Sequence, residues 1–165
     1  MEANKIEIDA YKAMEMLFKV IKPSKIAEGT DMSYSLMMRK AKKTIFRDKP
    51  LAFTQSNIDF LNQSIERIGL ELQKINISYV KSPSAEEPND TKKQMEVLKG
   101  YFQPSYIYTK LGKTSVWYCV RLKPYNPQAK NYYFSEDDIL AINLAIREAS
   151  SLLLNMKLMI VTPNS

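Results

Sequence analysis

Apolar residues recur at helical spacing along the first part of the chain and predict about three helices there. The first runs over about 9–21, with Asp9 as its cap residue. The second follows the cap-like segment 30–33 and ends at Pro50. The third has a 3-4-3-4-3 apolar spacing from Ile58 to Ile75, a heptad seam that can pack within one chain or between chains.

The pattern changes near residue 75 from helical to mixed. Residues 75–79 alternate between apolar and polar and predict a strand. A polar segment over 82–91 predicts a loop, and a short helix follows it to about residue 101. Two runs rich in β-forming residues, 106–109 and 115–120, then predict a hairpin around Gly112.

A long helix is predicted to begin after Ser135, which forms a capping-box pattern with Asp138. The 3-4-3-4-3 spacing returns between Ile139 and Met156, and only two residues in that interval are charged. This helix is therefore expected to be buried on most sides. The apolar segment 158–161 predicts a final strand, closed by Pro163.

These elements predict an α+β fold in one continuous globular unit. A helical region over 1–75 is followed, over 76–165, by a small antiparallel or mixed sheet packed on the long C-terminal helix. The order strand, helix, strand, strand, helix, strand is compatible with a ferredoxin-like βαββαβ arrangement.

The composition argues against most catalytic chemistry. The chain has no histidine, a single cysteine and four widely separated glycines. Histidine-based acid–base catalysis, cysteine-cluster metal sites and glycine-rich phosphate loops are thereby excluded. We expect no catalytic residue, no metal and no cofactor. An enzyme using carboxylates and magnesium is a minor alternative, because Glu136, Asp137 and Asp138 suit the cap of a helix better.

Two parts of the sequence are candidates for binding. The formal net charge is +6, and a basic cluster lies in the second predicted helix, where an ordinary solvated face is the alternative reading. The second candidate is the stretch 97–135, which lacks acidic residues but has six cations and ten aromatic residues. The candidate binding residues are Arg39, Lys40, Lys43 and Arg47 in the first part, and Tyr106, Tyr108, Lys110, Lys113, Trp117, Arg121 and Lys123 in the second.

Strand alternation would place Trp117 and Arg121 on one face of the predicted sheet. An open face of this kind would be a stacking surface for single-stranded nucleic acid. Aromatic residues and arginine also suit a protein interface, and aromatic residues are common in plain cores.

The sequence predicts a non-catalytic module that binds a polyanion, with nucleic acid, single-stranded in particular, preferred over an acidic protein. The alternative is protein–protein assembly or a structural role, such as a phage virion protein or an inhibitor of a host protein, with the two heptad seams forming a homo-oligomer. A small basic chain rich in Lys, Asn, Ile and Tyr is typical of phages and mobile elements. One cysteine, no secretory signal and no membrane-length apolar run predict an intracellular location, or one within a virion.

Overall fold

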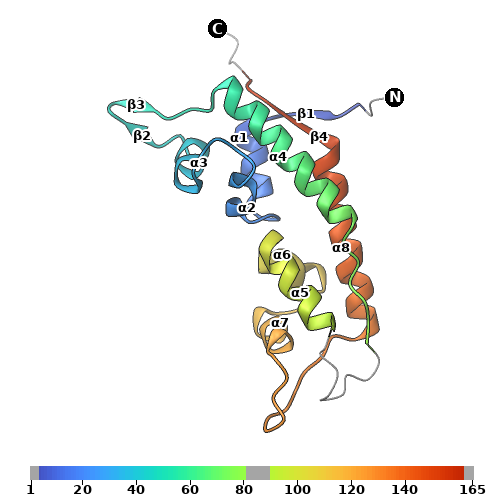
Figure 1. Ribbon diagram of the computed structural model, residues 1–165. Coiled ribbons are helices and arrows are strands. Elements are labelled where there is room, and N and C mark those ends of the chain that lie inside the picture. The colour runs from blue at the N-terminus through green and yellow to red at the C-terminus, as the bar shows by residue number, and fades with distance from the viewer. Residues whose placement is uncertain (1–3, 81–89, 162–165) are drawn as a thin grey trace.

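The computed structural model describes residues 4–80 and 90–161, which are mostly helical (Figure 1). Within these residues there are eight helices and two pairs of short strands. The helices are α1 (Ala10–Leu17), α2 (Pro23–Ala27), α3 (Tyr34–Ala41), α4 (Gln55–Gln73), α5 (Asp90–Tyr101), α6 (Pro104–Lys110), α7 (Ser115–Leu122) and α8 (Glu136–Asn155). The strands are β1 (Ile6–Asp9), β2 (Ile45–Phe46), β3 (Lys49–Pro50) and β4 (Met156–Met159).

Helices α4 and α8 lie side by side and form the spine of the molecule (Figure 1). Their two predicted seams are buried along this spine, and Ile68 and Ile146 are both fully inaccessible. The helices approach closely at Gly69, where an added Cβ would lie 2.8 Å from Cγ of Leu154. The Ser150 hydroxyl donates a hydrogen bond to the Gly69 carbonyl at this point (2.8 Å). Both seams are therefore used inside one chain.

The two described ends of the chain meet in a small parallel sheet. β1 pairs with β4 in the register Ile6↔Met156 to Asp9↔Met159. Asn62 of α4 fixes the sheet to the spine, because its side chain accepts a hydrogen bond from the Leu158 amide (2.8 Å) and donates one to the Leu158 carbonyl (3.0 Å). The predicted final strand is thus present, beginning two residues earlier.

Two regions pack against the spine. We call residues 10–53 the arm region, because they comprise α1–α3 and the β2–β3 hairpin that projects from the body (Figure 1). We call residues 90–135 the aromatic region, which comprises α5–α7 and the segment leading into α8. The regions meet at one antiparallel bridge between Ile21 and Phe102, where the Lys22 amide donates to the Tyr101 carbonyl (2.8 Å).

The predicted α+β fold class is wrong. Helices dominate the described residues, and neither a ferredoxin-like βαββαβ sheet nor a sheet packed on α8 is found among them. The predicted strand at 75–79 is not formed, because this segment has no regular secondary structure and no partner strand. Its Ile77 amide and carbonyl bond instead to the buried side chain of Asn143 on α8 (2.7 and 2.9 Å).

The predicted hairpin at 106–120 is in fact the helix pair α6 and α7. Pro104 occupies the first turn of α6, and the Thr114 hydroxyl caps α7 by accepting from the Trp117 amide (3.2 Å). As helices they place Ile107 and Tyr118 in the core, at 1% and 2% exposure. Packing therefore overrides the high β propensity of these aromatic and β-branched residues.

The predicted helix over 33–50 is shorter than expected. α3 ends at Ala41, and the chain turns back as the β2–β3 hairpin. The helices predicted to begin at Asp9 and after Ser135 are confirmed at their starts, since Asp9 caps α1 and Ser135 with Asp138 forms the capping box of α8. The first of them ends at Leu17 instead of residue 21, and α2 follows it from Pro23. The predicted loop over 82–91 lies mostly outside the described residues, as does Pro163.

Candidate nucleic-acid interface

Helices α2 and α3 form a pair joined by the segment 28–33. Thr30 organises this turn, because its hydroxyl donates to the Ala27 carbonyl (2.9 Å) and accepts from the Met32 amide (3.2 Å). Met32 is buried below the turn, and Ser33 caps α3 by accepting from the Leu36 amide (3.2 Å). The turn therefore sets the direction in which α3 leaves.

The turn is held tightly on α4. Gly29 lies so close to this helix that an added Cβ would be 2.7 Å from the Ser64 hydroxyl oxygen. The same hydroxyl donates to the Ile26 carbonyl at the end of α2 (2.6 Å). A residue larger than glycine would push the turn, and α3 with it, away from the spine.

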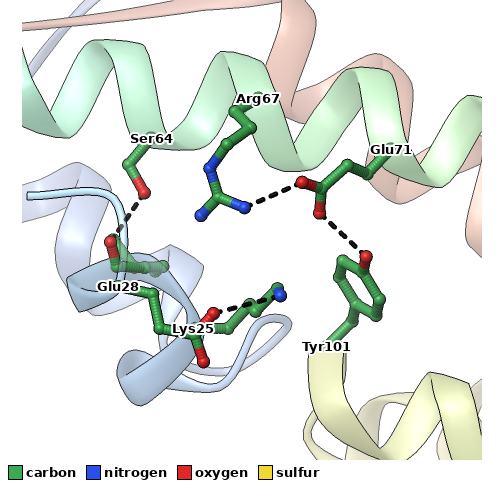
Figure 2. A network of polar contacts seen from close by, with 7 residues as sticks. Lys25, Glu28, Ser64, Arg67, Glu71 and Tyr101 are labelled. Carbon is green, nitrogen blue, oxygen red and sulfur yellow. Dashed lines mark hydrogen bonds and ion pairs between the residues drawn. The ribbon is translucent and has the colours of Figure 1, made fainter.

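A polar network next to the turn joins α2, α4 and α5 (Figure 2). On α4, Arg67 pairs with Glu71 (2.8 Å), which also accepts a hydrogen bond from the Tyr101 hydroxyl at the end of α5 (2.8 Å). Lys25 of α2 pairs with Glu28 (3.1 Å), and its ammonium lies 4.6 Å from the centre of the Tyr101 ring. The arm region is thus fixed both to the spine and to the aromatic region.

Tyr101 and Glu71 have altered proton affinities in this network. Burial and the hydrogen bond to Glu71 raise the pKa of Tyr101 to about 12. Burial alone would raise the pKa of Glu71, but the hydrogen bonds from Tyr101 and Arg67 outweigh it and hold that pKa below its usual value. At neutral pH the tyrosine is therefore protonated and the carboxylate ionised, which suits their hydrogen bond.

Helix α3 has one buried and one exposed face. Met37 is fully buried, whereas Tyr34, Ser35 and Arg39 face the solvent. Lys40 belongs to neither face, because its ammonium donates to the Asn57 side chain at the start of α4 (2.6 Å). Of the predicted binding residues on α3, Arg39 is available to a ligand and Lys40 anchors the helix.

The end of α3 directs the chain into the hairpin. The Lys43 and Thr44 amides donate to the carbonyls of Lys40 and Arg39 (both 2.9 Å), which is the bond pattern of a Schellman motif. Lys43 occupies the left-handed position of this motif, with φ 50°, where glycine is usual. Its ammonium lies 4.1 Å from the centre of the Tyr11 ring.

The β2–β3 hairpin is an exposed two-stranded arm (Figure 1). Arg47 and Asp48 form its tip with left-handed backbone angles (φ 49° and 63°), as a type I′ turn requires. Ile45 and Phe46 stand in the solvent at 71% and 47% exposure. Arg47 is therefore at the tip of an arm and not, as predicted, on a helix.

Cations surround this arm. The guanidinium carbons of Arg39 and Arg47 lie 5.4 and 5.2 Å from the centre of the Phe46 ring. Asp48 is the only acidic residue between Asp31 and Asp59. Among the ion pairs of the described residues, none involves a cation of α3 or of the arm. The basic surface consists of Arg39, Lys42, Lys43, Arg47 and Lys49.

The remaining predicted residues lie in the aromatic region, where the predicted stacking surface is not formed. The Tyr106 hydroxyl donates to the Ala145 carbonyl on α8 (3.0 Å), and its ring stacks on Phe102. Burial raises the pKa of Tyr106. The Tyr108 ring packs against Tyr118 at a centroid distance of 6.2 Å.

Trp117 and Arg121 share one side of α7, but they are occupied by each other. The Arg121 guanidinium carbon lies 3.8 Å from the centre of the Trp117 ring. Its nitrogens donate to the Tyr133 and Trp117 carbonyls (3.0 and 3.1 Å). The edge of Trp117 also packs against Phe134. These two residues therefore stabilise the aromatic region.

The lysines predicted in this region differ in their surroundings. Lys110 pairs with Glu148 of α8 (2.7 Å), and this hydrogen bond raises its pKa. The Lys113 ammonium lies 5.2 Å from the centre of the Trp117 ring. Lys123 is exposed and lines a pocket between α5 and the segment that follows α7.

Sequence reasoning missed the arm and its aromatic residue, Phe46. The segment 44–50 holds three β-forming residues before Arg47, but its turn lacks the Asn-Gly or Asp-Gly pair that marks most type I′ hairpins. It also missed Tyr34, which is exposed on α3 next to the basic cluster.

No group of histidine, cysteine or acidic side chains suited to a metal ion is found in the described part of the chain. Within the same residues, no helix has the length and apolar character of a membrane span. Searches of protein families, of curated proteins and of solved structures find no match to this chain.

Proposed function

We propose that this protein binds duplex DNA, with α3 in the major groove and the β2–β3 arm on the adjoining backbone. The observation that carries the proposal is the combination of an exposed α3, presented by a glycine-containing turn, with a projecting basic arm. Helix-turn-helix proteins hold their recognition helix in this way, and the likeness is one of arrangement alone.

The shape of the surface supports a duplex over a single strand. The major groove of B-DNA is about 12 Å wide and admits an α-helix, whose exposed side chains can reach the edges of the bases. Tyr34, Ser35 and Arg39 occupy that position on α3. Most aromatic rings of the surface predicted to bind a single strand instead pack against one another. Few of these rings are therefore open to a stacked base.

The charges support phosphate contacts by the arm. Arg47, Lys49 and Lys42 are exposed, and Arg47 lies near the same Phe46 ring as Arg39 of α3. Each phosphate that such a cation neutralises releases counterions from the duplex and strengthens binding at low salt.

The backbone supports a functional role for the same residues. The non-glycine residues with left-handed backbone angles in the described chain are Lys43, Arg47 and Asp48, all at the base or the tip of the arm. A left-handed angle costs roughly 1–2 kcal/mol for such residues. Lysine and arginine at these positions therefore reduce stability and keep charge where the proposed ligand lies.

An intracellular location goes with this proposal, because duplex DNA is found there or within a virion. The exposed, unpaired Cys119 is compatible with a reducing compartment.

The test compares the Arg39→Ala/Arg47→Ala variant with a matched control, Lys93→Ala/Arg147→Ala. Both variants lose two exposed cations, but the control residues lie on α5 and α8. Fluorescence anisotropy would follow binding to random-sequence duplexes of about 20 base pairs, enough for two turns of DNA. Salt would be varied between about 50 and 200 mM.

We expect the Arg39→Ala/Arg47→Ala variant to lose about tenfold or more in affinity and its salt slope to fall by about 0.9, because Arg47 contacts a phosphate whereas Arg39 faces the bases. The control should bind nearly as the unchanged protein does, and a single strand of equal length should bind more weakly. Equal losses in the two variants, or binding that ignores salt, would overturn the proposal.

A second candidate function is protein–protein assembly, which Leu140 and Leu144 favour. They lie one turn apart on α8 at 60% and 54% exposure. We rank this function second, because an assembly role leaves the basic arm unexplained. Light scattering tests it: a monomer at all concentrations would count against a homo-oligomer.

A further inference from the structure

A pocket lies in the aromatic region, far along the chain from the basic arm. Lys92 of α5, Val120 of α7 and the segment 123–132 line it, and it encloses about 560 Å³. Small-molecule sites are generally of this size, about 300–1,000 Å³.

The rim of the pocket is formed by a loop that Asn131 holds closed. The Asn131 side chain accepts from the Asn126 amide (2.9 Å) and donates to the Asn126 carbonyl (2.8 Å). It also donates to the Ala129 carbonyl (3.0 Å), while Pro124 and Pro127 restrict the backbone on either side of Asn126. These bonds shape the pocket without a ligand.

The lining is cationic. Lys92, Lys123 and Lys130 contribute to it, and among the described residues no carboxylate lines it. Lys92 is only 8% exposed; its ammonium donates to the Lys123 carbonyl (2.6 Å) and lies 4.9 Å from the centre of the Tyr133 ring. Burial lowers the pKa of Lys92. An anion in the pocket would lie near the three ammonium groups. It would favour the charged form of Lys92 and so oppose the lowering of its pKa by burial.

The pocket also contains aromatic rings that are open to a ligand. Tyr125 and Tyr132 line it at 43% and 38% exposure, in contrast to the buried rings of Tyr118 and Phe134. The Lys130 ammonium and the Arg121 guanidinium carbon lie 5.2 and 5.8 Å from the centre of the Tyr132 ring. A flat ligand group could stack on such a ring while its charged group meets a lysine.

We propose that this pocket binds a nucleotide, with its phosphate on Lys123 and Lys130 and its base against Tyr125, the more exposed of the two rings. A simple anion would use the lysines but not the rings, and an uncharged aromatic compound would use the rings but not the lysines. The nucleotide can be free in solution or a unit of a single-stranded nucleic acid, because both present the same phosphate and base. The inference does not rest on the duplex proposal, since it involves none of the residues of α3 or the arm.

The test uses isothermal titration calorimetry on the full chain. Adenosine, guanosine, cytidine and uridine monophosphates, inorganic phosphate, adenosine and a short oligothymidylate are titrated separately. The variants are Lys123→Ala/Lys130→Ala and Tyr125→Leu, whose replaced side chains are exposed and donate no hydrogen bond among those found for the described residues. Lys93→Ala/Arg147→Ala is the matched control with the same loss of charge, because both residues are exposed and neither lines the pocket.

We expect at least one mononucleotide or the oligonucleotide to bind, and to bind more tightly than phosphate or adenosine alone. Tyr125→Leu should weaken binding about fivefold or more, since stacking of a base on an aromatic ring contributes roughly 1–3 kcal/mol. The double lysine variant should lose at least tenfold, and the Lys93→Ala/Arg147→Ala control should bind normally. Tighter binding of the oligonucleotide would identify a single strand as the ligand, and equal or tighter binding of a mononucleotide a free nucleotide.

Three results would overturn the inference. The first is that neither nucleotides nor the oligonucleotide bind at millimolar concentration. The second is that phosphate alone binds as tightly as any nucleotide, because the rings then contribute nothing. The third is that the pocket variants and the Lys93→Ala/Arg147→Ala control lose affinity equally. None of these results bears on binding of duplex DNA by the arm.

Discussion

The arm region and the aromatic region both combine cations with aromatic rings, but they use them differently. In the aromatic region, Trp117 and Arg121 contact each other and bond to nearby backbone. In the arm region, Phe46 and its two neighbouring arginines stand at the surface. The comparison shows that a basic, aromatic, acid-free sequence does not by itself identify a binding surface. The Phe46 ring is exposed, whereas the Trp117 ring packs against Arg121 and Phe134, and this difference distinguishes the two cases.

The largest expected effect tests whether the two regions share one core. Ile68→Ala removes a fully buried side chain from the spine, and such changes cost roughly 2–5 kcal/mol. Both regions pack on the spine. The free energy of unfolding in urea should therefore fall by the same amount whether unfolding is followed by circular dichroism or by the fluorescence of Trp117. A shift in the first without the second would mean that the aromatic region unfolds separately.

The next effect concerns the arm region alone. Gly29→Ala places a Cβ 2.7 Å from the Ser64 hydroxyl oxygen, and overpacking of this kind typically costs about 1–3 kcal/mol. It should also weaken DNA binding by displacing α3. Gly100→Ala is the matched control, because a Cβ there meets nothing within 4 Å and should stabilise α5 by about 0.5–1 kcal/mol. Equal stabilities for the two variants would contradict the tight packing of the turn.

A smaller effect is expected in the aromatic region. Arg121→Ala removes the contact with Trp117 and two hydrogen bonds to backbone carbonyls. We expect a loss of about 1–2 kcal/mol, reduced by the partial exposure of Arg121, together with a change in tryptophan fluorescence. Affinity for duplex DNA should stay the same. A variant of normal stability that no longer binds duplexes would reverse the roles we give the two regions.

The smallest effect lies where the regions meet. Tyr101→Phe removes one hydrogen bond to Glu71 and should cost about 1 kcal/mol. Because folding raises the pKa of Tyr101 from its usual 10 to about 12, its protonated form favours the folded state. That contribution is complete below pH 10 and is lost as the pH rises towards 12. Between pH 10 and 12 the free energy of unfolding should therefore fall less steeply for Tyr101→Phe than for the unchanged protein. Tyr118 retains a similar pH dependence in both proteins. Identical curves would contradict the assigned hydrogen bond.

The sequence predicted the spine well and the regions around it poorly. The seams from Ile58 and Ile139 were evident, because long helices buried along one face repeat the same spacing many times. The short elements were not, since a few residues such as 106–109 suit a strand by propensity and a helix by packing. The site was predicted in part: Arg39 and Arg47 lie on the basic surface, but Lys40 anchors α3 and Phe46 was missed. The left-handed backbone of Arg47 and Asp48 gave no sequence signal.

Hydrogen–deuterium exchange on the full chain, with and without duplex DNA, would locate the bound duplex on the chain. We predict that added duplex slows exchange in peptides covering 34–51, which hold α3 and the arm, and leaves peptides covering 104–134 unchanged. Slower exchange confined to 104–134 would contradict it, because the duplex would then bind the region whose rings and cations we assign to stability and to the nucleotide pocket.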